Sequence, residues 1–186
     1  LDSDTGVYSG LDVEYCRAIA AAIGLDPDAN IEYIVASAGD RFTKLADKEI
    51  DVLIRTTTWT TSRDADLNAD FAGINFYDGQ GMLVNTVAHE GASSITDLNG
   101  AKICTTTGTT TEGNLADYFA ANDLTYEVVG VADDGAAMTK FKAEDCTAWT
   151  GDMSNMVAQQ YAVSQDSEVT FAMDIMPELL SKEPLG

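Results

Sequence analysis

Helical patterns alternate with short apolar segments along the first part of this chain. Residues 12–23 carry apolar side chains at helical spacing, residues 31–35 alternate apolar and polar side chains, residues 40–48 fit a short helix, and residues 50–54 form an apolar run. Alternation and short apolar runs are typical of strands, whereas apolar side chains three and four positions apart are typical of helices. This order of elements predicts a parallel sheet with helices packed on its faces.

The same alternation begins again after residue 84. Residues 77–84, which include Gly79 and Gly81, predict an extended segment that crosses from one lobe to the next and can bend. Beyond it we expect a short helix at 93–98, then strands at 101–105, 125–131, 146–150 and 169–173, separated by helices at 109–121, 133–143 and 152–161. The predicted fold class is therefore α/β, with two lobes joined by a hinge.

Acidic residues outnumber basic residues by 31 to 10, which gives a formal net charge of −21. A charge of this sign repels the phosphates of nucleic acids and of anionic membranes, so neither is expected as a partner. No run of about eighteen apolar residues is present, and no membrane-spanning helix is predicted. Three cysteines without close spacing and the single histidine, His89, predict neither a metal site nor another cofactor. An anionic ligand would need a local positive group in such a protein.

Arg63 is a candidate for that positive group. It ends a threonine-rich stretch, residues 55–63, that follows the predicted strand at 50–54. The planar guanidinium of arginine matches a carboxylate with two hydrogen bonds, and threonines add hydroxyl and backbone donors. The stretch therefore indicates a carboxylate-binding loop at the end of a strand. The alternative is a solvated surface arginine that pairs with Asp64 or Asp66.

Polar loops follow predicted strands at residues 55–63, 105–112 and 150–154. In open parallel sheets, ligands bind outside the carboxyl ends of the strands. The first loop belongs to one predicted lobe and the other two belong to the second lobe. A ligand held by all three would therefore bridge the lobes and favour a closed form.

Motifs distributed over most of the chain occur in a recognisable order. They are residues 10–18 (GLDVEYCRA), 41–45 (RFTKL) with 49–52 (EIDV), 58–63 (TWTTSR), 70–73 (DFAG), 108–112 (GTTTE) and 181–186 (SKEPLG). No single motif is specific, but the ordered set resembles the amino-acid-binding solute receptors of bacterial ABC transporters. Within that family, it is most similar to the subfamily that binds general L-amino acids.

The resemblance implies the fold of a periplasmic binding protein, with two α/β lobes and mainly parallel sheets. The first lobe is expected at residues 1–80, with residues 180–186 returning to it, and the second lobe at residues 81–179. The implied protein is periplasmic or otherwise extracytoplasmic, and captures L-amino acids for the membrane permease of an ABC importer. Family members have a strand before the helix at 12–23 and continue beyond residue 186. We therefore expect an incomplete first lobe that can associate with another copy.

The resemblance also implies roles for five residues. Arg63 is expected to bind the α-carboxylate of the ligand, and Thr56 and Thr58 are expected to complete that cradle. Thr110, at the start of a helix, is expected to contact the same carboxylate, because helix N-termini favour anions. Asp152 is expected to pair with the α-ammonium. Without the resemblance, Thr110 and Asp152 are equally well explained as caps of the helices that they precede.

The cysteines carry two further expectations. Cys104 and Cys146 lie on the first and third predicted strands of the second lobe. In the usual order of such sheets these strands are neighbours, so we expect a disulfide, with two buried thiols as the alternative. The resemblance implies that the partner of Cys16 lies on the preceding strand of the family, and Cys16 is expected to be unpaired here.

Two other functions fit the same scaffold, namely the ligand-sensing domain of a membrane receptor and a dehydratase-like enzyme. An enzyme needs a general acid or base, and neither Glu112 nor His89 has a recognisable partner in the sequence. We therefore expect a binding protein that is not an enzyme. Trp59 is expected to have a packing role, while Arg55 fits either the wall of a pocket or a salt bridge.

Overall fold

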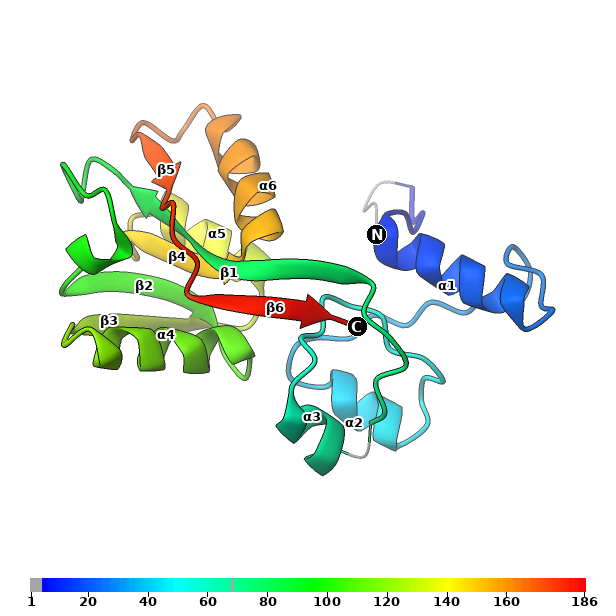
Figure 1. Cartoon of the computed structure of the whole chain (residues 1–186). Helices are drawn as coiled ribbons and strands as arrows, with labels where there is room; N and C mark the ends of the chain where they lie inside the picture. The colour runs from blue at the N-terminus through cyan, green and yellow to red at the C-terminus, as the bar shows by residue number, and fades with distance from the viewer. Residues whose placement is uncertain (1–4, 68) are drawn as a thin grey trace. The chain divides into compact units, whose positions relative to one another are not determined.

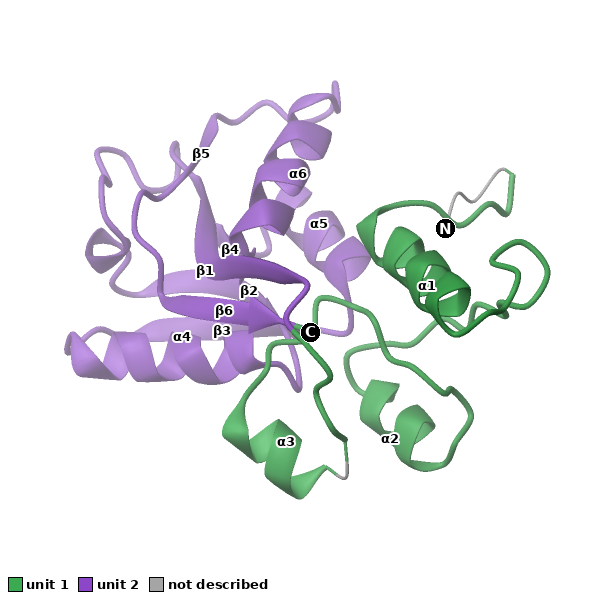
Figure 2. Cartoon of the chain, turned by 45° about the vertical axis from the view of Figure 1, so that its right-hand side comes forward, with its two compact units in different colours: residues 1–73, 186 green, residues 74–185 purple. Residues whose placement is uncertain are grey.

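The structure is a computed structural model that describes residues 5–67 and 69–186. The chain divides into two compact units, unit 1 with residues 1–73 and 186, and unit 2 with residues 74–185 (Figure 2). This division differs from the boundaries predicted for the lobes, which lay at residues 80 and 81 with a return at 180–186. The reason is that residues 76–85 and 181–185 form strands that pair within the sheet of unit 2.

Within the described residues, unit 2 is built on a six-stranded sheet with the order β3-β2-β4-β1-β5, and β6 pairs with β1 (Figure 1). The strands are β1 (Phe76–Asn85), β2 (Ala101–Thr106), β3 (Tyr126–Val131), β4 (Ala148–Asp152), β5 (Met173–Ile175) and β6 (Ser181–Leu185). β2 is parallel to both β3 and β4, whereas β1 is antiparallel to β4, β5 and β6. The predicted parallel sheet is therefore present in β3-β2-β4, and the strands around β1 make the whole sheet mixed.

Helices cover both faces of this sheet. They are the 3-10 helix η1 (Ile95–Asp97) and the α-helices α4 (Thr110–Ala121), α5 (Asp134–Lys142) and α6 (Met153–Ser164). Leu115 and Phe119 of α4 are buried in the core cluster of one face, and Phe141 of α5 packs with Trp149 in the cluster of the other face. Leu115, Phe119, Ala137 and Phe141 are wholly buried, whereas Tyr118 of α4 is only partly buried.

Unit 1 contains α1 (Leu11–Ala22), α2 (Arg41–Ala46) and α3 (Thr61–Asp66). The first two helices were predicted, but the strands predicted at 31–35 and 50–54 are wrong, because both segments are irregular. A strand needs a neighbour with which to form a ladder, and neither segment has one among the described residues. The strand predicted at 169–173 is wrong except at Met173, because residues 169–172 are irregular and β5 begins at Met173. The helix α3 occupies the end of the predicted polar loop.

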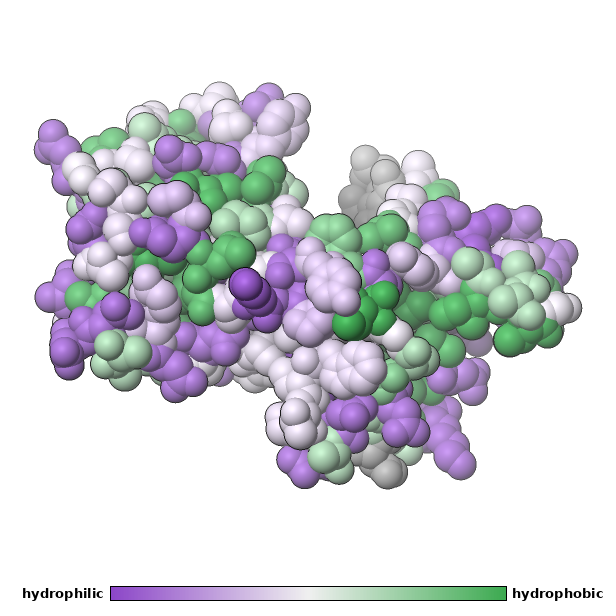
Figure 3. Space-filling model, in the orientation of Figure 1, coloured by the Kyte–Doolittle hydropathy of each residue, from purple (hydrophilic) through white to green (hydrophobic). Residues whose placement is uncertain are grey.

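Unit 1 buries little apolar mass. In its described part, the buried hydrophobic residues are Ala20, Ala38 and Ala69. Large apolar side chains remain on its surface, where hydrophobic residues are green in Figure 3. They include Leu11, Ile19, Ile23, Val35 and Val52. Apolar packing therefore stabilises unit 1 less than it stabilises unit 2.

The cysteines behave as predicted. Cys104 of β2 and Cys146, two residues before β4, form a disulfide with 5.7 Å between their Cα atoms. The bond joins β2 to the segment that leads into β4, the parallel neighbour of β2 in the sheet. Cys16, half-buried in α1, is a free thiol.

Candidate functional site

Arg63 is a buried arginine that is held in place by its neighbours in unit 1. Its backbone N–H donates to Oγ1 of Thr60, the N-cap of α3, at 3.2 Å. The residue is 8% exposed, its Nη1 donates to the carbonyl oxygen of Thr58 at 2.9 Å, and its guanidinium lies 5.4 Å from the centre of the Phe42 ring. A guanidinium buried and oriented in this way is not the solvated surface arginine of the alternative interpretation.

The threonines that precede α3 differ in their roles. Thr56 is exposed and has a φ of +26°, a backbone conformation that β-branched residues rarely adopt. Thr57 is buried and its hydroxyl donates to the carbonyl oxygen of Arg55 at 2.6 Å. Thr58 is also buried, and its carbonyl oxygen orients Arg63. A strained residue next to buried neighbours, here Thr57 and Thr58, is a common feature of ligand-binding loops.

Two other residues of this loop have contacts of their own. Trp59 stacks on Phe71, with ring centres 5.1 Å apart and an angle of 9° between the rings, which supports its predicted packing role. Arg55 lies near Asp12: burial raises the pKa of the Asp12 carboxyl, and the positive charge of Arg55 partly opposes this shift.

Thr110 is the first residue of α4, which follows β2 in unit 2. The cap of the helix is Thr109, whose Oγ1 accepts from the backbone N–H of Glu112 at 3.3 Å. The Glu112 carboxylate accepts from the backbone N–H of Gly108 at 3.0 Å. Because Thr109 is the cap, Thr110 is not needed for that task; its hydroxyl donates to Oε2 of Glu183 at 3.5 Å.

Asp152 ends β4 and occupies the N-cap position of α6, yet its side chain makes no capping hydrogen bond. The first turn of α6 is bound by Asp78 of β1 instead. The Asp78 carboxylate accepts from the backbone N–H of Ser154 at 3.3 Å and also from the Ser154 hydroxyl. The cap interpretation of Asp152 is therefore wrong, and its pairing with a ligand ammonium stays a prediction.

The five predicted residues form two sets, one in each unit. Thr56, Thr58 and Arg63 lie in unit 1, on α3 and the loop before it. Thr110 and Asp152 lie in unit 2, at the carboxyl ends of β2 and β4, which are neighbouring parallel strands. The location of the second set agrees with the general rule that α/β sheets bind ligands at this edge.

Two buried polar residues lie near the unit 2 set, and the sequence indicates a binding or supporting role for neither of them. Glu183 of β6 is 1% exposed and accepts hydrogen bonds from Ser181 Oγ at 2.8 Å and from Asn114 Nδ2 at 3.1 Å. Gln80 of β1 is wholly buried and is the register partner of Asp152 across the β1–β4 pair. The available signal was a single amide inside an otherwise apolar or glycine-containing run, residues 79–84.

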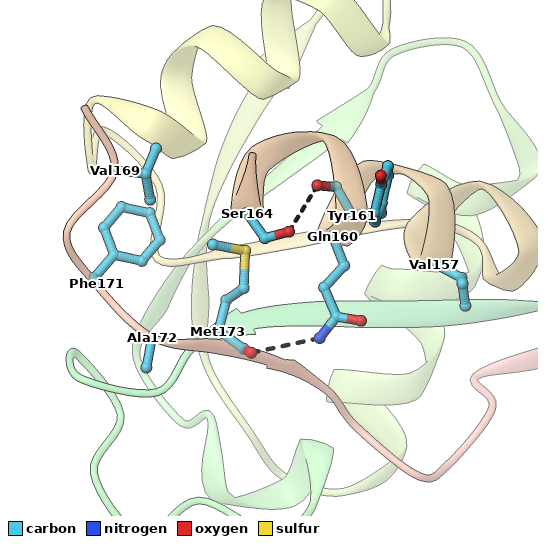
Figure 4. A pocket seen from close by; sticks show the side chains of 8 residues that line it. All are labelled: Val157, Gln160, Tyr161, Ser164, Val169, Phe171, Ala172 and Met173. Carbon is cyan, nitrogen blue, oxygen red and sulfur yellow. Dashed lines mark hydrogen bonds between the residues drawn. The ribbon is translucent and has the colours of Figure 1, made fainter. Parts of the chain in front are cut away.

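A hollow of about 540 Å³ lies elsewhere on unit 2, between α6 and the segment that leads into β5 (Figure 4). The Gln160 Nε2 donates to the carbonyl oxygen of Met173 at 3.4 Å across its floor. The described residues that line it are Val157, Gln160, Tyr161, Ser164, Val169, Phe171, Ala172 and Met173. None of the five predicted binding residues is among them.

The α/β sheet with helices on both faces, two compact units and polar residues at the carboxyl ends of parallel strands define the class of periplasmic binding proteins, as predicted. The chain belongs to the bacterial extracellular solute-binding proteins, family 3, which it matches over residues 1–168. In the described residues, no helix has both the length and the apolar character needed to cross a membrane.

Several known proteins are similar to this chain. The chain is 46% identical, over 181 residues, to the glutamate/glutamine/aspartate/asparagine-binding protein BztA of Rhodobacter capsulatus. This match covers 97% of the chain and 52% of BztA. It is 40% identical, over 182 residues, to the general L-amino acid-binding periplasmic protein AapJ of Rhizobium johnstonii. This match covers 98% of the chain and 51% of AapJ. A periplasmic binding protein from Brucella ovis with glutathione bound superimposes with a TM-score of 0.89 at 44% identity. The superposition covers 99% of this chain and 56% of the Brucella ovis protein. The chain spans about half the length of the curated relatives it matches.

Proposed function

We propose that this protein captures L-α-amino acids outside the cytoplasm and delivers them to the permease of an ABC importer. The observation that carries the proposal is Arg63, a buried guanidinium that local contacts orient on a threonine loop. The family of the chain supports the same function, as do BztA and AapJ, both of which are named as amino-acid-binding proteins. The proposal includes a periplasmic location and no catalytic activity.

In the proposed complex, Arg63 binds the α-carboxylate of the ligand with two N–H groups, and Thr56 and Thr58 complete that contact. Thr110 contributes the backbone N–H of a helix N-terminus, because its hydroxyl already donates to a carboxylate of its own unit. Asp152 accepts from the α-ammonium. A zwitterion requires a cationic partner and an anionic partner, and Arg63 and Asp152 are the proposed pair.

The test is calorimetry on the full chain after a thermal-shift screen of the twenty amino acids. Because BztA is named for glutamate, glutamine, aspartate and asparagine, these four are the first candidates. A free amino acid that binds should be compared with its N-acetyl and amide derivatives, each of which lacks one of the two charges. We expect both derivatives to bind at least about thirtyfold more weakly. Equal affinity for all three would contradict the zwitterion site.

A further inference from the structure

Gln80 of β1 is a wholly buried carboxamide that joins three elements of unit 2. Its Nε2 donates two hydrogen bonds of 3.0 Å, one to the carbonyl oxygen of Thr111 in the first turn of α4 and one to Oγ1 of Thr150 in β4. The Thr150 hydroxyl in turn donates to the carbonyl oxygen of Gly81 at 2.7 Å. One side chain therefore ties the start of α4 to β1 and β4.

The partners fix the direction of this carboxamide. The carbonyl oxygen of Thr111 can only accept, so the NH₂ group of Gln80 must face it. The opposite atom, Oε1, is buried and accepts no hydrogen bond from the described residues. Buried acceptors are nearly always satisfied in native proteins, so the buried Oε1 of Gln80 is unusual. A residue that only filled the core would be apolar here, as Met82 and Val84 are on the same face of β1.

The two hydrogen bonds lead to the two unit 2 residues of the proposed site. Thr111 directly follows Thr110, so the bond to its carbonyl group holds the turn that presents the Thr110 backbone N–H. Asp152 is the register partner of Gln80 across the β1–β4 pair, and Thr150 lies two residues before it on β4. Gln80 thus holds neighbours of both residues, Thr111 and Thr150. Its side chain does not bond to the groups proposed to bind the ligand, which are the Thr110 backbone N–H and the Asp152 carboxylate.

We propose that Gln80 is a positioning residue for amino-acid binding. It holds the first turn of α4 against β4, so that Thr110 and Asp152 keep the separation that a bound amino acid requires. Binding groups on rigid, supported elements lose affinity when the supporting contact is removed, because the geometry of the site loosens. The inference rests on the proposed function of Thr110 and Asp152.

The first variant to measure is Gln80→Met, which keeps the side-chain volume and removes both donors. Gln160→Met is the matched control, because it also loses one amide-to-carbonyl bond in unit 2, the bond to Met173 (Figure 4). We expect Gln80→Met to weaken the binding of L-glutamate or L-glutamine by about tenfold in calorimetry. Gln160→Met should leave the affinity unchanged. Thr150→Val, which removes one of the two acceptors, should give an intermediate loss.

A second readout does not depend on a ligand. Amide hydrogen exchange at residues 112–115, in the first turns of α4, should be about tenfold faster in ligand-free Gln80→Met than in the wild-type protein. The rest of the sheet and the control variant should be unchanged. Unaltered exchange at these amides, or a uniform increase across unit 2, would overturn the positioning role. If the wild-type protein binds no amino acid, the proposed function fails, and the exchange result still decides whether Gln80 holds α4.

Discussion

At the scale of single residues, the proposed binding depends on a charge that the protein orients before any ligand arrives. Replacing Arg63 by alanine should cost about 2–5 kcal/mol of binding, which is roughly thirtyfold to several thousandfold in affinity. Arg63→Lys should rescue only part of this loss, because an ammonium cannot bind a carboxylate at two points and also keep the bond to the Thr58 carbonyl group.

Calorimetry with L-glutamate or L-glutamine measures both variants. Arg17→Ala is the matched control, because Arg17 pairs at 2.8 Å with Asp28 on the surface of unit 1, where the two side chains are 36% and 77% exposed. The control should bind like the wild-type protein. An Arg63→Ala variant that keeps its affinity within about threefold would show that the ligand carboxylate binds elsewhere.

Protonation of His89 should change the stability of the folded protein just below neutral pH. Burial lowers its pKa, and its Nε2 lies 2.7 Å from Oγ1 of Thr147. The unfolded chain therefore binds a proton more readily than the folded protein. The stability that neutral His89 contributes is complete above the unfolded pKa of about 6.5 and is lost as the pH falls through it.

We expect this loss to be at most about 1 kcal/mol, since His89 is only half-buried and solvent screens its charge. Urea unfolding of wild-type protein and His89→Gln between pH 7.5 and pH 5.5 measures the difference. The variant should show the shallower pH dependence. Parallel curves for the two proteins would mean that His89 does not contribute.

At the scale of elements, two aspartates near the start of α6 should separate stability from binding. Asp78 binds the first turn of the helix through Ser154, whereas Asp152 occupies the cap position without a capping bond. Asp78→Ala should therefore reduce the free energy of unfolding by about 1 kcal/mol and leave ligand affinity nearly unchanged. Asp152→Ala should nearly abolish binding with a smaller effect on unfolding. Urea unfolding and calorimetry on both variants test these roles. A loss of binding in Asp78→Ala together with a loss of stability in Asp152→Ala would contradict the assignment.

The elements also show how far the sequence predicts this fold. The helices of unit 2 and its parallel strands follow from local periodicity and capping, because each buries its own apolar face. The strands expected at 31–35 and 50–54 are absent, since strand formation depends on a partner elsewhere in the chain, which a local pattern does not report.

The same distinction holds for the binding residues. Arg63 is visible in the sequence because an arginine in a threonine-rich stretch of a strongly acidic chain is unusual. Asp78 and Gln80 could not be assigned, because their partners Ser154 and Thr111 are distant in sequence and meet them only through the β1–β4 register and the packing of α4. Their roles follow from tertiary contacts alone.

At the scale of the whole molecule, the apolar residues on the surface of unit 1 predict self-association. Leu11, Ile23 and Val35 are 54%, 68% and 67% exposed. Because the net charge of −21 repels a second copy, association should strengthen as salt screens that charge. Sedimentation velocity at rising protein and salt concentrations measures it. Ile23→Lys should reduce association, whereas Val157→Lys, an exposed apolar position of unit 2, should not. A protein that stays monomeric at high salt would contradict the expectation.

The two units should also differ in stability. Unit 2 has two core clusters of buried residues and a disulfide, whereas the described part of unit 1 buries three alanines as its hydrophobic residues. Amide hydrogen exchange should therefore be fast in α1 and α2 and slow in β1, β2 and β4 of the ligand-free protein. An amino acid that binds Arg63 stabilises the folded form of unit 1 by mass action, by about 2.7 kcal/mol at a concentration one hundred times its Kd. Exchange in the loop at 55–63 and in α3 should slow accordingly, and Arg63→Ala should remove the effect. Equal protection of both units without ligand would show that contacts other than apolar packing hold unit 1 together.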